Sequence, residues 1–159
     1  MAWLGLTAAA TYRTLRGFEG TDRWDGIDEG LRQTLQYGRD HVTSSDVLEA
    51  QDTAHRLNVA LVELFHDVDF LVTPTCAGQT PPPDQFGTIN GVVEQNWVRF
   101  TYGFNLTRSP AGSVCAGLTT DGMPVGLQVV GPQHADAGVL RLLALLEDTI
   151  AFTHRASVG

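Results

Sequence analysis

Two short apolar segments joined by a tight turn constrain the fold of this chain more than any other feature. Residues 113–116 and 125–130 are short, mainly apolar runs, which is typical of buried strands. The turn between them, TTDGMP at 119–124, contains Asp121-Gly122, a dipeptide that favours a hairpin-like connection. Residues 70–73, stopped by Pro74, predict a third strand. Three strands are few for an open α/β sheet.

The residues before and after these strands in the sequence show the periodicity of helices. The clearest helix is expected over residues 44–66, where Leu57, Leu61 and Leu64 repeat at helical spacing and Thr43 or Ser44 can cap the first turn. Further helices are expected over 3–15 and 26–39, and from Asp136 as N-cap along the apolar face Val139, Leu143, Leu146 and Ile150. For residues 97–104 the sequence is compatible with either a short helix or an extended segment.

These elements predict an α/β fold in which helices cover a sheet of short strands, apolar on both faces. The 159 residues correspond to a single domain. The Pro-, Gly- and Thr-rich stretch at about 76–91 predicts a long flexible loop, and such loops are usually functional or mobile.

Charge excludes several function classes. The net charge is −8, and all ten cationic side chains are arginine, so the sequence contains no lysine. An acidic chain without a basic cluster is a poor ligand for phosphate backbones, and no nucleic-acid partner is expected. A mechanism that needs a lysine base or Schiff base cannot be completed by these residues.

The expected location is the cytoplasm, without membrane association. The N-terminal stretch lacks the features of a secretory signal, and no apolar run reaches about 18 residues. Cys76 and Cys115, 39 positions apart, form no metal motif and no disulfide framework, so both are expected to be buried thiols. A disulfide bond between Cys76 and Cys115 is the alternative.

Candidate catalytic and metal-binding residues are few. Cys115, His134 and Asp136 are the right types for a cysteine hydrolase, but Cys115 lies in an expected strand rather than at a strand-to-helix elbow. No histidine pair has the spacing of a helical zinc site, and no metal is expected. The serines lack a G-x-S-x-G setting. The triplet beginning at Asn105 matches a glycosylation acceptor, yet nothing else points to secretion.

Three stretches, read in order, are similar to the C-terminal portion of amidase signature enzymes. They are DFLVTPT at 69–75, NLTRSPAGSVCAG at 105–117 and DGMPVGLQVVG at 121–131. The resemblance implies the C-terminal part of that family's α/β/α sandwich, with a mixed sheet covered by helices, in a chain that forms one partial domain over residues 1–159. It implies hydrolysis of a carboxylic amide by a Ser–cis-Ser–Lys triad, without a cofactor. No triad residue can be carried over onto this sequence, so the chain is predicted to be inactive by itself.

The resemblance also assigns residues. A wall of the substrate pocket is expected at Trp97, Phe100, Thr101 and Phe104. The structural family motif comprises Asp69, Pro74, Asn105, Pro110, Gly117, Gly122, Pro124, Gly126 and Gln128. Arg108 stands where the family usually has glycine, Cys115 where proline is common, and Val98 where the tRNA-dependent amidotransferase branch tends to carry aspartate. The valine, together with the acidic charge, favours a general amidase.

Two partner hypotheses follow. The chain pairs with an N-terminal amidase portion that carries the serines and the lysine, and acts on a small-molecule amide in the complete enzyme. Alternatively it is a non-catalytic interaction module that associates with such a portion or with itself.

Overall fold

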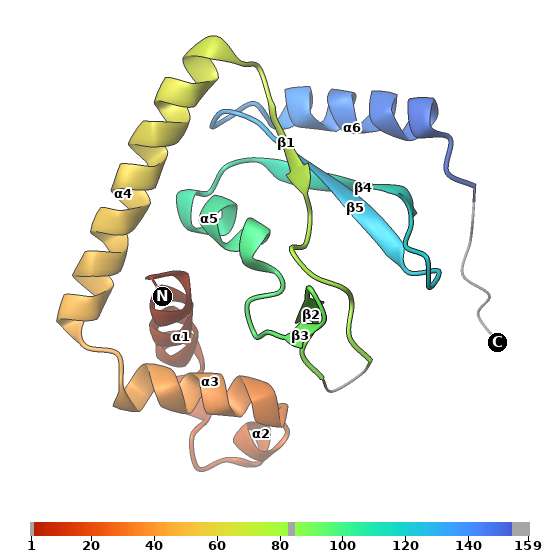
Figure 1. Ribbon diagram of the computed structural model, residues 1–159. Coiled ribbons are helices and arrows are strands. Elements are labelled where there is room, and N and C mark those ends of the chain that lie inside the picture. Colours follow the sequence, from red (N-terminus) through yellow and green to blue (C-terminus); the bar gives the residue numbers. More distant parts are fainter. Residues whose placement is uncertain (1, 83–84, 154–159) are drawn as a thin grey trace. The chain divides into compact units, whose positions relative to one another are not determined.

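The computed structural model describes residues 2–82 and 85–153 of the chain (Figure 1). The chain divides into two compact units, residues 1–58 and 59–159. The boundary falls within the longest helix, α4 (Ser44–Asp67). Whether the whole chain acts as one partial domain stays a prediction.

The first unit is helical. It contains α1 (Ala2–Leu15), a 3₁₀ turn η1 (Arg16–Phe18), α2 (Asp22–Asp25), α3 (Glu29–Asp40) and the start of α4. Helices α1 and α3 pack closely because Gly38 faces Ala8, where an added Cβ would come within 2.4 Å of the Ala8 carbonyl oxygen. Leu35 and Ala8 are fully buried at this contact.

Polar side chains determine where two of these helices begin. The Asp28 carboxylate accepts the N–H groups of Gly30 at 2.9 Å and Leu31 at 3.2 Å. Because Asp28 is the N-cap, α3 begins at Glu29, three residues later than the sequence predicts. The side chains of Thr43 and Asp46 each accept the backbone N–H of the other at the start of α4, at 3.2 and 2.7 Å. Helix 44–66 is therefore confirmed almost residue for residue, with Thr43 as its cap.

The second unit is built on a three-stranded antiparallel sheet in the order β1-β5-β4. The strands are β1 (Leu71–Pro74), β4 (Ala111–Leu118) and β5 (Pro124–Val130). The hairpin predicted around Asp121-Gly122 is confirmed, with Gly122 at φ +83°. All strand pairs among the described residues are antiparallel, so this part of the chain supplies none of the parallel pairing of a mixed sheet.

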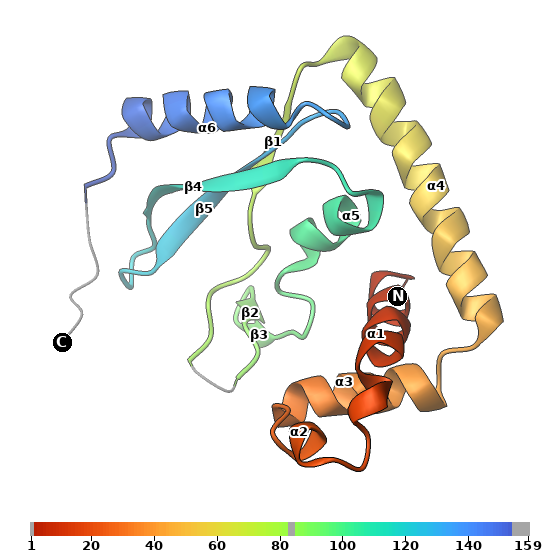
Figure 2. The same cartoon turned by 180° about the vertical axis from the view of Figure 1, so that it is seen from behind.

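Helices lie on opposite faces of this sheet. Helix α6 (Asp136–Ile150) packs on β4 and β5, where the Leu143 side chain occupies the space that a Cβ on Gly112 would fill. Helix α5 (Arg99–Thr107) lies on the other side, as both views of the ribbon show (Figures 1 and 2). The segment left open by the sequence is thus helical from Arg99. Asp136 is the first residue of α6 rather than its cap, because Ala135 occupies the cap position.

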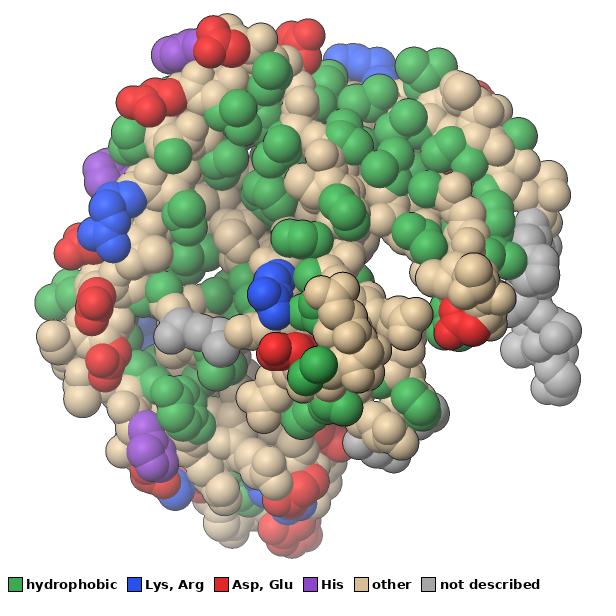
Figure 3. Space-filling model, in the orientation of Figure 1, with side chains coloured by type: hydrophobic (Ala, Val, Ile, Leu, Met, Phe, Trp, Pro, Cys, Tyr) green, Lys and Arg blue, Asp and Glu red, His purple; other side chains and the backbone are tan. Residues whose placement is uncertain are grey.

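Burial in this unit is concentrated at one end of the sheet. Val129, Val130 and Val139 are buried, whereas Val72 on β1 is 49% exposed. The expectation of strands that are apolar and covered on both faces is therefore wrong over much of the sheet: β1 alternates between half-buried and exposed residues. Hydrophobic side chains remain at the surface over α6 and the second half of α4, including Leu140, Leu145, Val59 and Val62 (Figure 3).

The stretch at 76–91 contains more structure than a loop. Strand β2 (Thr88–Ile89) pairs with β3 (Val92–Val93). The two residues between them, Asn90 and Gly91, have φ values of 51° and 81°, as a primed hairpin turn requires. Gln79 also bridges to Thr88. The predicted flexibility of this stretch stays a prediction, and Pro83 lies outside the described residues.

Candidate functional site

Trp97 holds the hairpin in place. Its backbone carbonyl accepts N–H groups from Ala77 at 2.8 Å and Gly78 at 3.2 Å. Its ring lies against Gly87, where an added Cβ would approach the ring carbons to 2.6 Å. The side chain is thus packed against the hairpin, and its role in a substrate pocket stays a prediction.

Gln128 connects the sheet to α5. It is 4% exposed, and its amide nitrogen donates to Thr73 Oγ1 at 3.0 Å and to the Phe100 carbonyl at 3.2 Å. The Phe100 side chain is 40% exposed, and the Thr101 hydroxyl donates to the Val98 carbonyl at 3.0 Å. Phe100 is therefore positioned through its backbone while its ring remains accessible.

Phe104 lines a different space, a cavity of about 770 Å³ beside the start of α6. Trp97, Phe100 and Thr101 are not among its lining residues, so this cavity does not unite the four predicted wall residues. The lining residues are Phe104, Asn105, Arg108, Ser109, Pro110, Ala111, Gly112, Gln133, His134, Asp136, Val139, Leu140 and Leu143.

The end of α5 explains part of the family motif. Arg108 adopts the left-handed conformation, φ 57° and ψ 32°, and its N–H donates to the Asn105 carbonyl at 3.4 Å. This is the helix-ending geometry that glycine adopts at least cost, which accounts for the glycine expected at this position. Pro110 follows, and its carbonyl accepts the Gly131 N–H at 3.0 Å, which aligns β4 with the end of β5.

Other motif residues lie where the backbone turns. Asp69 is exposed between α4 and β1, and Pro74 is the last residue of β1. Gly117, at φ +150°, occupies the irregularity in the β4–β5 pairing. Pro124 begins β5.

A second cavity, of about 460 Å³, lies at the other end of the sheet. Gly126 in the central strand opens it, since an added Cβ would come within 2.5 Å of Thr75 Oγ1. The hydroxyls of Thr75 and Ser113 meet over this glycine at 2.7 Å. The lining residues are Thr75, Cys76, Ala77, Gly78, Gln79, Thr80, Ser113, Val114, Cys115, Thr119, Met123, Pro124, Val125 and Gly126. We call this space the Gly126 cavity.

Pairing partners place the Gly126 cavity on the α5 side of the sheet. Thr73 and Ser113 both pair with Gln128, whose side chain points to α5, and Cys115 pairs with Gly126 two residues along β5. Residues paired across a sheet, and residues two apart along a strand, share a face. The face opposite α6 therefore carries small hydroxyl-bearing residues instead of an apolar core.

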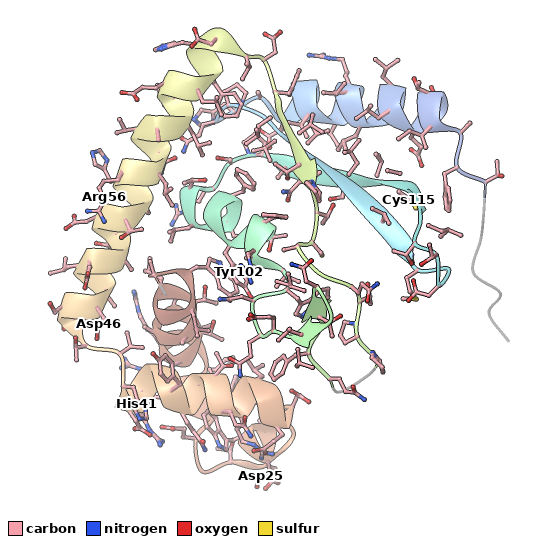
Figure 4. The ribbon with its side chains drawn as sticks, viewed as in Figure 1. Asp25, His41, Asp46, Arg56, Tyr102 and Cys115 are labelled. Atoms are coloured by element: carbon pink, nitrogen blue, oxygen red, sulfur yellow. The ribbon has the colours of Figure 1, made fainter. Side chains whose placement is uncertain are left out.

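The three residues expected for a cysteine hydrolase do not lie in one site. Cys115 lines the Gly126 cavity, whereas His134 and Asp136 line the 770 Å³ cavity. His134 follows the end of β5 that pairs with Ala111, four residues and about 13 Å along β4 from Cys115. The Cys115 thiol instead approaches the Gly117 carbonyl at 3.4 Å, near the β4–β5 turn (Figure 4).

Both cysteines are free and half-buried, rather than fully buried as predicted. Burial raises the pKa of the Cys76 thiol. Within residues 2–82 and 85–153, no group of three or more His, Cys, Asp and Glu side chains is placed to hold a metal ion. His154 and Ser157 lie outside these ranges. No helix in the described part of the chain has the length and apolar character needed to cross a bilayer.

Comparison with known proteins identifies the family. The amidase family model matches residues 20–140. Fatty acid amide hydrolase of Arabidopsis thaliana is 37% identical over 120 residues, which cover 73% of this chain and 20% of that protein. An acylamidase of Rhodococcus erythropolis is 44% identical over 127 residues, covering 76% of this chain and 26% of that protein.

The fold agrees with these matches. A crystal structure of an amidase superposes with a TM-score of 0.79 at 25% identity, covering 93% of this chain and 34% of that one. The chain therefore belongs to the amidase signature family, whose members hydrolyse C–N bonds. It spans between a fifth and a third of the length of these relatives.

Proposed function

We propose that this chain forms the C-terminal portion of a general amidase and contributes one wall of the substrate site without supplying the catalytic groups. The match to the amidase family over residues 20–140 supports this proposal most directly. In the complete enzyme the reaction converts a carboxylic amide to an acid plus ammonia or an amine. Location in the cytoplasm and the absence of a cofactor belong to the same proposal.

The sequence supports inactivity of the chain alone. It contains no lysine, and the family's triad requires a lysine to take the proton relayed from the attacking serine. Ser113 and Ser109 have hydroxyl partners, Thr75 at 2.7 Å and Thr107 at 2.9 Å, and neither partner is a base. A hydroxyl bonded only to another hydroxyl is not an activated nucleophile.

Val98 supports the general-amidase branch. It immediately precedes α5 and has an apolar side chain where the amidotransferase branch tends to carry a carboxylate that holds the substrate amine. Without that carboxylate, an ammonium group would be poorly recognised there. Phe100, at 40% exposure two residues later, suits an apolar substrate group better.

The test of inactivity is an assay of the purified 159-residue chain with simple carboxamides, measuring ammonia release. We expect no release above that of buffer. Ammonia release by the purified chain would overturn the assignment of the chemistry to another portion of the enzyme, and its loss after Cys115→Ala or after replacement of all five serines by alanine would show which residue type of this chain is responsible.

A second candidate function is a non-catalytic interaction module. The exposed hydrophobic residues of α6, Leu140 at 66% and Leu145 at 61%, favour it. Gel filtration separates the alternatives: the module hypothesis predicts self-association that the double variant Leu140→Gln/Leu145→Gln abolishes. A monomer at all concentrations would contradict self-association.

A further inference from the structure

Helix α6 is apolar on two opposite sides. The side turned to β4 and β5 is buried or half-buried and repeats at helical spacing, with Val139, Leu142, Leu143, Leu146 and Ile150. The opposite side, which we call the outer face of α6, is exposed and comprises Ala137, Leu140, Arg141, Ala144, Leu145 and Asp148. Among the described residues of the second unit, no helix or strand lies over this face, as both ribbon views show (Figures 1 and 2). A helix that is apolar on both sides is normally covered on both, so the outer face is a candidate interface.

Two charged residues lie near the middle of the outer face. Arg141 and Asp148 are seven residues apart, which is two helical turns and about 10.5 Å along the axis. Neither side chain forms an ion pair within residues 2–82 and 85–153. In this part of the chain the outer face thus presents one cation and one anion that are unpaired and held at a fixed separation.

The C-terminal end of α6 carries charge of the unfavourable sign. Its last turn has no basic residue and contains Glu147 and Asp148. The unsatisfied carbonyl groups at the C-terminus of a helix carry partial negative charge, so carboxylates there are unfavourable and a cation is favourable. A cation supplied by another molecule would therefore be stabilised beside Asp148.

A second copy of α6, laid antiparallel on the first, supplies that cation. A two-fold axis level with the 144–145 peptide bond brings Arg141 of each copy opposite Asp148 of the other, so two ion pairs form. Ala144 and Leu145 then lie beside the axis, where each meets its own copy, and the small alanine lets the helices approach closely. A parallel arrangement would instead place Arg141 beside Arg141 and Asp148 beside Asp148, and like charges across an interface are costly. The charges therefore favour the antiparallel arrangement.

We propose that the outer face of α6 binds a second copy of this chain in antiparallel orientation, with Arg141 of each copy paired to Asp148 of the other. This proposal rests on the interaction-module function given above, because it names the partner and the arrangement of that self-association. Leu140 and Leu145, 66% and 61% exposed, supply the apolar part of the contact. A single pair of short helices is smaller than a standard interface of about 1,600 Å², so the dimer dissociates on dilution.

The experiment measures self-association of the 159-residue chain by sedimentation equilibrium over a range of concentrations. Arg141→Glu places a carboxylate opposite Asp148 at two symmetric positions, and Asp148→Arg likewise places two pairs of arginines together. Each change should weaken association at least about tenfold, because it replaces attraction by like-charge repulsion. The double variant Arg141→Glu/Asp148→Arg restores both ion pairs with the signs exchanged, and its association should return to within about twofold of wild type.

A matched control makes the same change of charge elsewhere. Arg56 is exposed on α4, away from the outer face of α6 (Figure 4). Arg56→Glu should leave association within about twofold of wild type, since distant sites act independently. Because Arg141 and Asp148 are also exposed, circular dichroism should show the same helical content in all four variants.

The outcomes separate the two levels of the account. A wild-type chain that stays monomeric at every concentration would overturn both the interaction-module function and the antiparallel arrangement. Self-association that Leu140→Gln/Leu145→Gln abolishes, but that Arg141→Glu weakens no more than Arg56→Glu does, would leave the module function standing and overturn the arrangement. Failure of the double charge exchange to recover association would also overturn the arrangement.

Discussion

Thr75 Oγ1 and Ser113 Oγ lie 2.7 Å apart although strand β5 lies between β1, which ends just before Thr75, and β4, which carries Ser113. The contact exists because the intervening residue is Gly126. A glycine of the family motif thus opens a cavity and joins two hydroxyls over it.

Gly126→Ala should destabilise the second unit. The new Cβ would lie 2.5 Å from Thr75 Oγ1, so the hydroxyl pair must separate, and we expect a loss of about 1–3 kcal/mol, as for overpacking. Urea denaturation followed by circular dichroism measures it. Gly103→Ala is the control: Gly103 is helical and has nothing within 4 Å of the new methyl, so it should be neutral or stabilising by up to about 1 kcal/mol. Equal effects of the two changes would contradict the packing account.

Gln128→Leu should loosen α5 from the sheet. The substitution leaves the Phe100 carbonyl without its donor from β5, and a lost buried partner costs about 1–3 kcal/mol. Gln33→Leu, on the exposed surface of α3, should change stability by less than about 0.5 kcal/mol. The urea midpoints of both variants test this difference, and a Gln128 variant as stable as wild type would show that the link is not stabilising.

Arg108→Gly should stabilise the chain. Glycine adopts the left-handed conformation at φ 57° without the steric cost of a side chain, and the expected gain is about 0.5–1 kcal/mol. Arg99→Gly, within the first turn of α5, should have the opposite effect, because glycine loses more conformational entropy than arginine when it enters a helix. A thermal midpoint for Arg108→Gly below that of wild type would mean that the arginine side chain makes a stabilising contact that outweighs its backbone strain.

Acid should remove the stabilisation at the start of α4. The Thr43 hydroxyl and N–H donate to the Asp46 carboxylate at 2.6 and 2.7 Å, and these bonds lower the pKa of Asp46. A lowered folded-state pKa stabilises the helix above the unfolded pKa, and the effect is lost as the pH falls through the folded value. Wild type should therefore be more helical than Asp46→Ala at neutral pH by circular dichroism, and the difference should vanish in strong acid. A difference that is constant between the two conditions would contradict the assignment.

Most of the secondary structure could be predicted because caps, apolar periodicity and turn dipeptides lie within the element that they specify. Helix 44–66 has a cap, an apolar period and a charged first turn within its own residues, and it was predicted to within a residue. The β4–β5 hairpin likewise follows from Asp121-Gly122. Asn90-Gly91 carries the same type of signal, which the surrounding Pro- and Gly-rich stretch obscured, so the β2–β3 hairpin was missed.

The arrangement of side chains in space could not be predicted from spacing. Cys76 and Cys115 are 39 positions apart, and their common cavity depends on β5 lying between β1 and β4. For the same reason His134 and Cys115, only 19 positions apart, are at opposite ends of the sheet. The exposure of strands that were expected to be covered could not be predicted for a different reason. An apolar strand has the same sequence pattern whether the layer that covers it belongs to the same chain or to another one.

Amide hydrolysis by a chimera tests the central claim most directly. In it, the part of this chain that matches the Rhodococcus erythropolis acylamidase, 76% of its length, replaces the aligned segment of that enzyme, at 44% identity over 127 residues. We predict that the chimera hydrolyses the acylamidase's amide substrates, that the chain alone does not, and that alanine in place of the acylamidase's own nucleophile abolishes the activity of the chimera. Activity of the chain alone, or a folded chimera without activity, would contradict the account.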